Sequence, residues 1–282
     1  MAIAAVLFVV WLFGVWPPPI WYRWNYPGET AFMALRRHQD PAGALHRRYH
    51  PVRLGGIPMA LRRSALIGED VRFYQHHGID YVEMRRAMGY PRDSYSWMSS
   101  RDRSDLWHAI ERSVTHPGRI RGASTITQQL AKNLYLSPSR NPLRKVKEAV
   151  TAWRLEFWLP KDRILELYLD TSEMGKEIWG ADAASEAYYR IPALRMTREE
   201  SASLAALLPF PRSSNPDYRP GRMIWRRNLI LARMGGRPAI ILPDSVSRVP
   251  VDADTTASVD SVATAVPPPS DTTSRSKFPT RP

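Results

Sequence analysis

Helical periodicity dominates the pattern of apolar and polar positions in the dense part of the chain, residues 64–235. The stretch Thr197-Arg-Glu-Glu200 is a capping-box pattern that opens the apolar run ASLAALLP. No run of alternating apolar and polar residues, typical of a strand, stands out. One apolar stripe at helical spacing ends before Pro160 and consists of Leu143, Val146, Val150, Trp153 and Phe157. The pattern predicts a mainly α-helical fold.

The chain opens with an uncharged apolar stretch, AIAAVLFVVWLFGVW. As a helix this stretch would span roughly 22 Å, less than the roughly 30 Å hydrocarbon core of a bilayer. Trp16, Trp21 and Tyr22 are typical of an interfacial aromatic belt. Because no basic region or small-residue cleavage site flanks the stretch, the pattern favours a transmembrane anchor over residues 1–22 rather than a signal peptide. The first basic residue, Arg23, follows it, so the positive-inside rule alone would place the body in the cytoplasm.

Composition divides the rest of the chain into three regions. Residues 23–57 are basic and irregular, which predicts a juxtamembrane segment. Residues 58–235 carry the helical pattern and form the predicted globular domain. Residues 236–282 are rich in Pro, Ser, Thr and Asp and contain few large apolar side chains, so we expect them to be disordered.

Charge and cysteine content narrow the classes of function. The formal net charge is +13 and the pI is near 10.2, which indicates a negatively charged partner such as a nucleic acid, a membrane surface or a phosphorylated substrate. The 282 residues include no cysteine, which excludes disulfides, thiolate zinc sites and cysteine nucleophiles.

Two adjacent carboxylates, Glu69 and Asp70, lie within the otherwise apolar stretch ALIGEDVRFYQHHGID. Removing a carboxylate from water costs free energy unless the group is paired. Either both side chains lie on a solvated helix face, or at least one is held in place for chemistry.

The stretch RGASTITQQLAKNLYL contains a second candidate site. Gly122 allows a close turn, and Thr125 with Gln128 fits a capping box, so a helix is predicted to begin near Thr125. Thr125, Gln129 and Lys132 then share one polar stripe, which at a helix N-terminus could receive an anion such as phosphate. A well-capped amphipathic helix without such a role fits the pattern equally well. The opposite, buried face is predicted to hold Ile126, Leu130, Ala131 and Leu134.

Arg144, Lys145 and Glu148 can share one helix face, opposite the apolar stripe. They are either a surface ion pair or a basic cluster for a diphosphate, in which Glu148 orients the cations or binds a divalent metal. Further along, residues 161–189 predict a helix, a loop containing Gly175 and Gly180, and a second helix, with Glu166 and Glu173 mainly structural.

Five segments together resemble the motifs of the peptidoglycan glycosyltransferases, in matching order and approximate spacing. This family comprises the transglycosylase domains of class A penicillin-binding proteins and the monofunctional biosynthetic enzymes. The first motif is Glu69-Asp-Val-Arg-Phe73 with His76 and Gly78. The other four are Ser124-Thr-Ile-Thr-Gln-Gln-Leu-Ala-Lys-Asn133, Arg144-Lys-x-x-Glu148, Ile164-Leu-Glu-x-Tyr-Leu169 with Gly175 and Gly180, and Glu200-x-Ala-x-Leu-Ala-Ala206 with Pro209.

The chain departs from the family pattern in a few places. Ala123 stands where Gly is usual, Asp170 where Asn is common, and Tyr189 where Phe is frequent. The stretch 78–122 is longer than in the family by roughly a dozen residues. Too little chain remains after residue 235 for a transpeptidase domain, so the match is to the monofunctional, membrane-anchored type.

The resemblance implies a lysozyme-like helical domain with a cleft between two lobes. The implied reaction polymerises lipid II into β-1,4-linked glycan strands and releases undecaprenyl pyrophosphate. It implies a single-pass protein of the inner (plasma) membrane with its catalytic domain on the periplasmic, extracytoplasmic side. Lipid II, the growing glycan chain and the membrane are the implied partners, and other cell-wall synthesis or division proteins are further candidates; no nucleic acid is expected.

The resemblance also implies roles for individual residues. Glu69 would be the general base that takes the proton of the acceptor hydroxyl. Asp70 would hold the local backbone by hydrogen bonds, and His76 would be structural. Glu148 would act with the basic side chains and is a candidate ligand for Mg²⁺ or Mn²⁺. Substrate contacts would come from Asp70, Phe73, Ser124, Thr125, Gln129, Lys132, Asn133, Arg144 and Lys145.

Two other functions fit parts of the sequence. A lytic muramidase would also use one glutamate, as a general acid toward a neutral glycan, but needs no basic diphosphate site. A membrane-tethered nucleic-acid binder is permitted by the net charge, although no nucleic-acid-binding motif is present.

Overall fold

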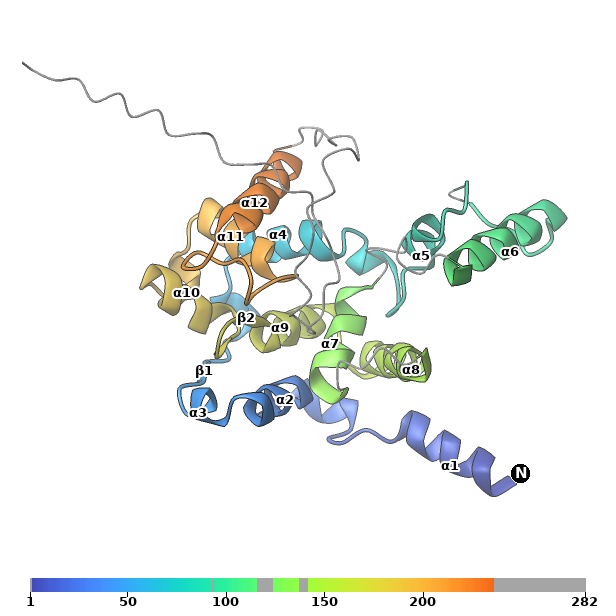
Figure 1. Ribbon diagram of the computed structural model, residues 1–282, viewed down its shortest axis with the longest axis horizontal. Helices are drawn as coiled ribbons and strands as arrows, with labels where there is room; N and C mark the ends of the chain where they lie inside the picture. Colours follow the sequence, from blue (N-terminus) through green and yellow to red (C-terminus); the bar gives the residue numbers. More distant parts are fainter. Residues whose placement is uncertain (1, 93, 116–123, 137–141, 236–282) are drawn as a thin grey trace, which may run out of the picture.

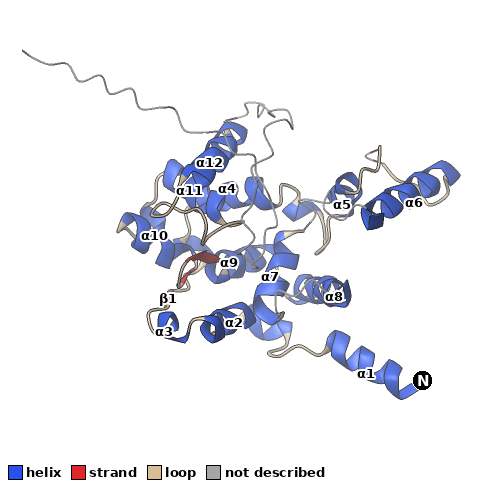
Figure 2. Cartoon of the chain, viewed as in Figure 1, coloured by secondary structure: helices blue, strands red, loops and turns tan. Residues whose placement is uncertain are grey.

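Helices make up most of the structure, as the periodicity predicts (Figures 1 and 2). The computed structural model describes residues 2–92, 94–115, 124–136 and 142–235. Gly122, Ala123 and the predicted disordered tail lie outside the described residues. The α-helices of the described part are α1 (Ala2–Phe13), α2 (Ala31–Gln39), α3 (Pro41–Ala44), α4 (Met59–Glu69), α5 (Tyr81–Ala87), α6 (Ser100–Thr115), α7 (Ile126–Tyr135), α8 (Pro142–Trp158), α9 (Lys161–Thr171), α10 (Ala181–Tyr189), α11 (Arg198–Leu207) and α12 (Gly221–Met234).

The hydrophobic core is built around α9. Every residue of this helix from Arg163 to Thr171 is buried. On one side α7 packs against α8 and α9, and on the other α4 packs against α11 and α12. Figure 1 shows α5 and α6 standing away from these helices. The core therefore fixes the ends of α4 and α7 relative to each other.

A small sheet forms where a loop was expected after α9. Its strands are β1 (Arg48–Tyr49), β2 (Glu173–Gly175) and β3 (Ile178–Trp179), in the order β1-β3-β2. β1 is parallel to β3 and β2 is antiparallel to it. Gly180 follows with φ of 86°, and a Cβ there would lie 2.5 Å from the carbonyl oxygen of Asp170, so this position requires glycine.

The N-terminal part differs from its prediction. Helix α1 spans only 12 residues, about 18 Å, and ends shortly before three consecutive prolines from Pro17, which lack the N–H groups that a helix requires. Within the described ranges, no helix has the length and apolar character needed to cross a bilayer. The structure therefore does not show the transmembrane helix predicted over residues 1–22.

The segment 23–57 is not irregular. It contains α2, α3 and β1, and Thr30 caps α2 by accepting a hydrogen bond from the Met33 N–H. Met33 and the preceding Tyr22 are both 1% exposed and lie in the core. This segment thus packs with the rest of the chain, and the domain boundary predicted at residue 58 stays a prediction.

The apolar stripe predicted on α8 faces outward. Leu143, Val146, Trp153 and Phe157 are all exposed, whereas Glu148 lies on the buried side with Thr151, Ala152, Leu155 and Leu159. The stripe and the acid are on opposite faces, as the spacing predicts, but the buried face is the one that carries Glu148.

Candidate active site

Glu69 is the last residue of α4, and its carboxylate is held at both oxygens. Gln129 Nε2 donates to Oε2 over 3.0 Å, and Arg226 Nη2 donates to Oε1 over 2.8 Å. Arg226 Nη2 also donates to the carbonyl oxygen of Gly68 over 2.7 Å. The Glu69 side chain is 10% exposed. Its surroundings are therefore partly buried and polar, in contrast to its apolar neighbours in the sequence.

Asp70 serves a different element. Its Oδ2 accepts a hydrogen bond from the Ile126 N–H over 2.9 Å, in the first turn of α7. Both of its oxygens lie 3.0 Å from His76 Nε2. A carboxylate is favourable at a helix N-terminus, where backbone N–H groups lack partners within the helix. Asp70 therefore ties the end of α4 to the start of α7.

The capping box predicted at Thr125 is present. Thr125 Oγ1 accepts from the Gln128 N–H over 3.1 Å, and Gln128 Oε1 accepts from the Thr125 N–H over 3.1 Å. Thr125 Oγ1 also donates to the carbonyl oxygen of Gly78 over 2.6 Å. The predicted buried face of α7 is confirmed; on the predicted polar stripe Gln129 and Lys132 are half-buried, whereas Thr125 is buried because it caps the helix.

Arg144, Lys145 and Glu148, here called the basic cluster, form one ionic group. Arg144 Nη1 donates to Glu148 Oε2 over 2.9 Å, and Lys145 Nζ donates to Glu148 Oε1. The Glu148 side chain is only 3% exposed, so the group is not a surface ion pair. Lys145, which is 49% exposed, also donates to Ser124 Oγ over 2.9 Å.

The start of α7 connects the basic cluster to Glu69. Ser124 contacts Lys145, and Gln129, five positions later, contacts Glu69. Ser124 directly precedes the N-cap residue Thr125, and Gln129 lies about one turn into α7. Both contacts therefore lie at the N-terminal end of α7.

Comparison with known proteins shows the family of this chain. A family model described as "Transglycosylase" matches residues 99–235. The chain is 36% identical to the biosynthetic peptidoglycan transglycosylase of Bordetella pertussis, over 82% of this chain and 87% of that protein. The chain belongs to the peptidoglycan transglycosylase family. Proteins of the same name from Laribacter hongkongensis, at 35% identity over 81% of this chain and 90% of theirs, and Methylobacillus flagellatus, at 32% over 83% and 93%, are also similar.

Family membership confirms the resemblance and identifies the chain as a glycosyltransferase. The alternatives of a lytic muramidase and of a nucleic-acid binder find no support, because the relatives are transglycosylases. A place in the cell envelope is consistent with the relatives' role in peptidoglycan synthesis.

Four of the predicted contact residues of this transglycosylase are buried, and Asp70 and Thr125, at 8% and 3% exposed, are two of them. Phe73 is 1% exposed, and the ammonium group of Lys161 lies 4.3 Å from the centre of its ring. Asn133 is 7% exposed. Phe73 therefore belongs to the hydrophobic core, and we leave it out of the proposed contacts.

Sequence reasoning missed two residues that position the site. Arg226 lies on the face of α12 that also carries Met223 and Ile230, which are 4% and 1% exposed. A charged residue on an apolar helix face was the signal that could have found it. Tyr168 donates its hydroxyl to Gln129 Oε1 over 3.1 Å, which orients the amide that contacts Glu69.

Glu148 does not suit a divalent cation as the structure stands. Both of its oxygens already accept bonds from cationic side chains, which a metal ion would have to displace. The two groups of acidic and histidine side chains within metal-binding distance in the described chain do not include Glu148. One, formed by Asp70, His76 and Asp80, is occupied by bonds to helix N-termini. We therefore derive no step through a metal at Glu148.

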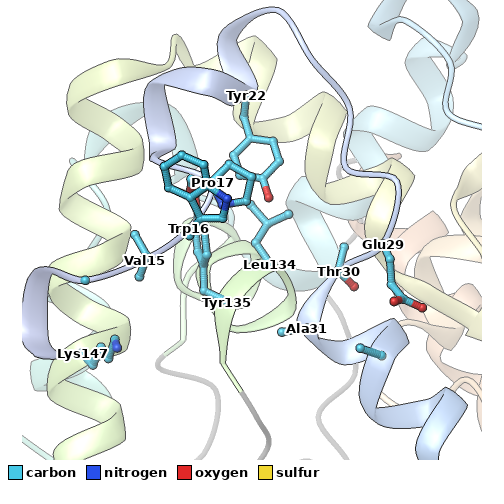
Figure 3. A pocket seen from close by; sticks show the side chains of 12 residues that line it. Val15, Trp16, Pro17, Tyr22, Glu29, Thr30, Ala31, Leu134, Tyr135 and Lys147 are labelled. Atoms are coloured by element: carbon cyan, nitrogen blue, oxygen red, sulfur yellow. The ribbon is translucent and has the colours of Figure 1, made fainter.

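Two cavities of the described part lie away from Glu69. One, of about 310 Å³, lies between the segment after α1 and helices α7 and α8, with Trp16, Tyr22 and Tyr135 around Pro17 (Figure 3). The other, of about 320 Å³, is lined by Phe13, Val150, Trp153, Arg154 and Phe157. Both adjoin the apolar N-terminal part of the chain.

Proposed function

We propose that this transglycosylase polymerises lipid II, joining the 4-hydroxyl of an incoming GlcNAc to the anomeric carbon of the growing chain's MurNAc. The observation that carries the proposal is the connection, through the first turns of α7, between the carboxylate of Glu69 and the basic cluster. A sugar transfer with a diphosphate leaving group needs a base on one side of the reacting carbon and cations on the other.

In the proposed reaction Glu69 accepts the proton of the 4-hydroxyl as its oxygen attacks the anomeric carbon. A carboxylate has about four lone-pair sites, so the bonds from Gln129 and Arg226 leave room for this proton. The new β-1,4 bond forms while the bond between the anomeric carbon and the phosphate oxygen breaks. The electron pair of that bond leaves with undecaprenyl pyrophosphate.

Negative charge grows on the diphosphate as it leaves, and fixed cations stabilise that charge. In the proposal these cations are Arg144 and Lys145, together with Lys132, which lies one turn along α7 from Gln129. Glu148 holds both cluster cations in place, which makes it a positioning residue. Thr125 caps α7, and Ser124 accepts a hydrogen bond from Lys145, so both residues hold the N-terminal end of α7 beside the basic cluster.

The proposal places the protein at the extracytoplasmic face of the inner membrane. Its catalytic domain is, in the same proposal, lysozyme-like with two lobes. Lipid II carries a polyprenyl chain that stays in the bilayer, so the enzyme must work at a membrane surface. The exposed apolar side chains of α1 and of the outer face of α8 support this location.

The test is polymerisation of labelled lipid II by the detergent-solubilised protein, read as glycan polymer on a gel. Glu69→Gln should abolish the polymer while the melting temperature stays close to wild type. Glu199→Gln, the same change at an exposed position of α11, is the matched control and should keep its activity. Near-normal polymer from Glu69→Gln would show that the base is assigned wrongly.

The same assay separates the remaining possibilities about chemistry. Release of short fragments from preformed glycan, without polymer from lipid II, would indicate a hydrolase. Repeating the assay with Mg²⁺, Mn²⁺ or a chelator tests whether polymerisation depends on a divalent cation, which would then act on the diphosphate of the substrate.

A further inference from the structure

A second group of ligand side chains lies away from the candidate active site. His50 comes directly after β1, and Asp182 and Glu186 lie one turn apart on α10. One ligand atom from each of the three residues lies within 4.8 Å of the other two. The group shares no residue with the site around Glu69 and the basic cluster.

The ion-pair distance between His50 and Glu186 is one that a shared metal ion would also give. His50 Nδ1 lies 3.3 Å from Glu186 Oε2. In a tetrahedral zinc site with bonds of about 2.0–2.1 Å, two ligand atoms are separated by about 3.3 Å. The two carboxylates repel each other on one helix face, and a dication between them would cancel their charge.

Asp182 is already oriented for such a role. Its Oδ1 accepts a hydrogen bond from the Ala193 N–H over 2.9 Å, which fixes the carboxylate and leaves Oδ2 available. Ligating carboxylates are commonly held by a hydrogen bond of this kind. Because the side chains of His50 and Glu186 are 55% and 50% exposed, water can complete the coordination.

We propose that His50, Asp182 and Glu186 form a binding site for one divalent first-row transition-metal ion, with Zn²⁺ as the best fit. One imidazole and two carboxylates suit such an ion, whereas Mg²⁺ and Ca²⁺ prefer oxygen ligands alone.

The bound ion would join the segment after β1 to α10. Backbone groups already hold this segment on both sides of His50. The Arg48 N–H donates to the carbonyl oxygen of Glu177 over 2.8 Å, and the Val52 N–H donates to Asp170 Oδ1 over 3.2 Å. The metal adds a side-chain link between these two contacts, so its role is to stabilise the fold rather than to take part in sugar transfer.

The test uses the detergent-solubilised full chain after removal of metal with a chelator. Titration calorimetry should show one strong Zn²⁺ equivalent, and Zn²⁺ but not Mg²⁺ should raise the melting temperature. His50→Gln and Glu186→Gln should each weaken that binding about tenfold or more and remove the thermal shift. His46→Gln, at another exposed histidine four residues earlier, is the matched control and should bind as wild type does.

Two results would overturn the proposal. One is the absence of a strong equivalent in the wild-type protein. The other is unchanged binding by both His50→Gln and Glu186→Gln, which would assign the ion to unrelated surface groups. Melting temperatures measured without metal show whether each variant is folded. If His50→Gln does not fold, Glu186→Gln alone provides the test of binding. Because neither readout uses lipid II turnover, the result is independent of the proposed reaction.

Discussion

Glu69 and Asp70 are adjacent, yet their carboxylates contact different parts of the molecule. α4 ends at Glu69, and the backbone of Asp70 leaves the helix with φ of −160° and ψ of 79°. This turn in the backbone directs Glu69 toward Arg226 and Gln129, and Asp70 toward the N-terminus of α7. Asp70 is thus committed to holding α7, whereas Glu69 is the acid to which the proposed reaction gives the proton transfer.

Arg226→Gln should lower lipid II turnover by on the order of tenfold to a hundredfold, because a loosened Glu69 spends less time in reacting position. Turnover and the melting temperature are to be measured together. Arg227→Gln is the matched control, since the guanidinium of Arg227 contacts its exposed neighbour Asn228. A loss of turnover explained entirely by unfolding, or an equal loss in Arg227→Gln, would contradict a positioning role.

Asp170 is a buried carboxyl whose charge is unfavourable. Its side chain is fully buried; Oδ1 accepts from the Val52 N–H, and Oδ2 has no partner in the described structure. Burial raises the pKa of the Asp170 carboxyl from 3.8 to about 8, against the opposing effect of the Val52 N–H. Between these values the native state binds a proton that the unfolded chain does not bind. The contribution of Asp170 to stability is therefore complete below about pH 4 and is lost as the pH rises to about 8.

Asp170→Asn should remove this loss, because the amide keeps the shape and never ionises. The melting temperatures of wild type and variant should be similar at low pH. The variant should then become more stable by several degrees as the pH rises, with a constant difference above about pH 8. Asp217→Asn, at an exposed acid, should show no such trend. A difference that does not depend on pH would contradict a raised pKa.

At the scale of elements, α7 carries the geometry of the site. Its N-terminus is held by the Thr125 capping box, by Asp70 and by Lys145 through Ser124. Its polar side then presents Gln129 to Glu69. A shift of this helix end would move the acid and the cations relative to each other.

Thr125→Val should therefore affect both stability and activity. Loss of a helix N-cap costs about 1 kcal/mol, or roughly 2–4 °C in melting temperature. Thr197→Val removes the same kind of cap from α11, where the capping box is exposed. We expect a thermal loss in both variants, larger in Thr125→Val because its buried hydroxyl also donates to the carbonyl oxygen of Gly78, but a marked loss of lipid II turnover in Thr125→Val alone. Equal turnover in both would mean that the α7 cap is merely structural.

The elements that the sequence predicted are those with local determinants. Capping boxes at Thr125 and Thr197 fix helix starts through residues three apart, so they could be read directly. The β2–β3 hairpin could not be read, because its strands are two or three residues long and β3 pairs with β1, more than a hundred residues earlier in the chain. Arg226 was missed for the same reason, since its partner Glu69 is distant in sequence. Local patterns do not encode such contacts.

At the scale of the whole molecule, apolar side chains are left on the surface of α1 and α8. Periodicity located the α8 stripe correctly but could not tell which solvent it faces, because a bilayer and a protein core select the same residues. Phe157 is 77% exposed and Trp153 48%. With α1 nearby, where Arg154 donates to the carbonyl oxygen of Phe13, these residues form one continuous apolar region. We expect this region to enter the lipid surface.

A single cysteine can test this expectation, because the natural chain has none. Phe157→Cys labelled with an environment-sensitive fluorophore should show brighter, blue-shifted emission when lipid vesicles are added, since the probe moves from water into the bilayer. Leu194→Cys is the matched control: Leu194 is 60% exposed but lies outside α1 and α8, so its probe should stay in water. Equal emission changes at both positions, or none at position 157, would show that the outer face of α8 does not meet the membrane. The exposed stripe would then need a protein partner to cover it.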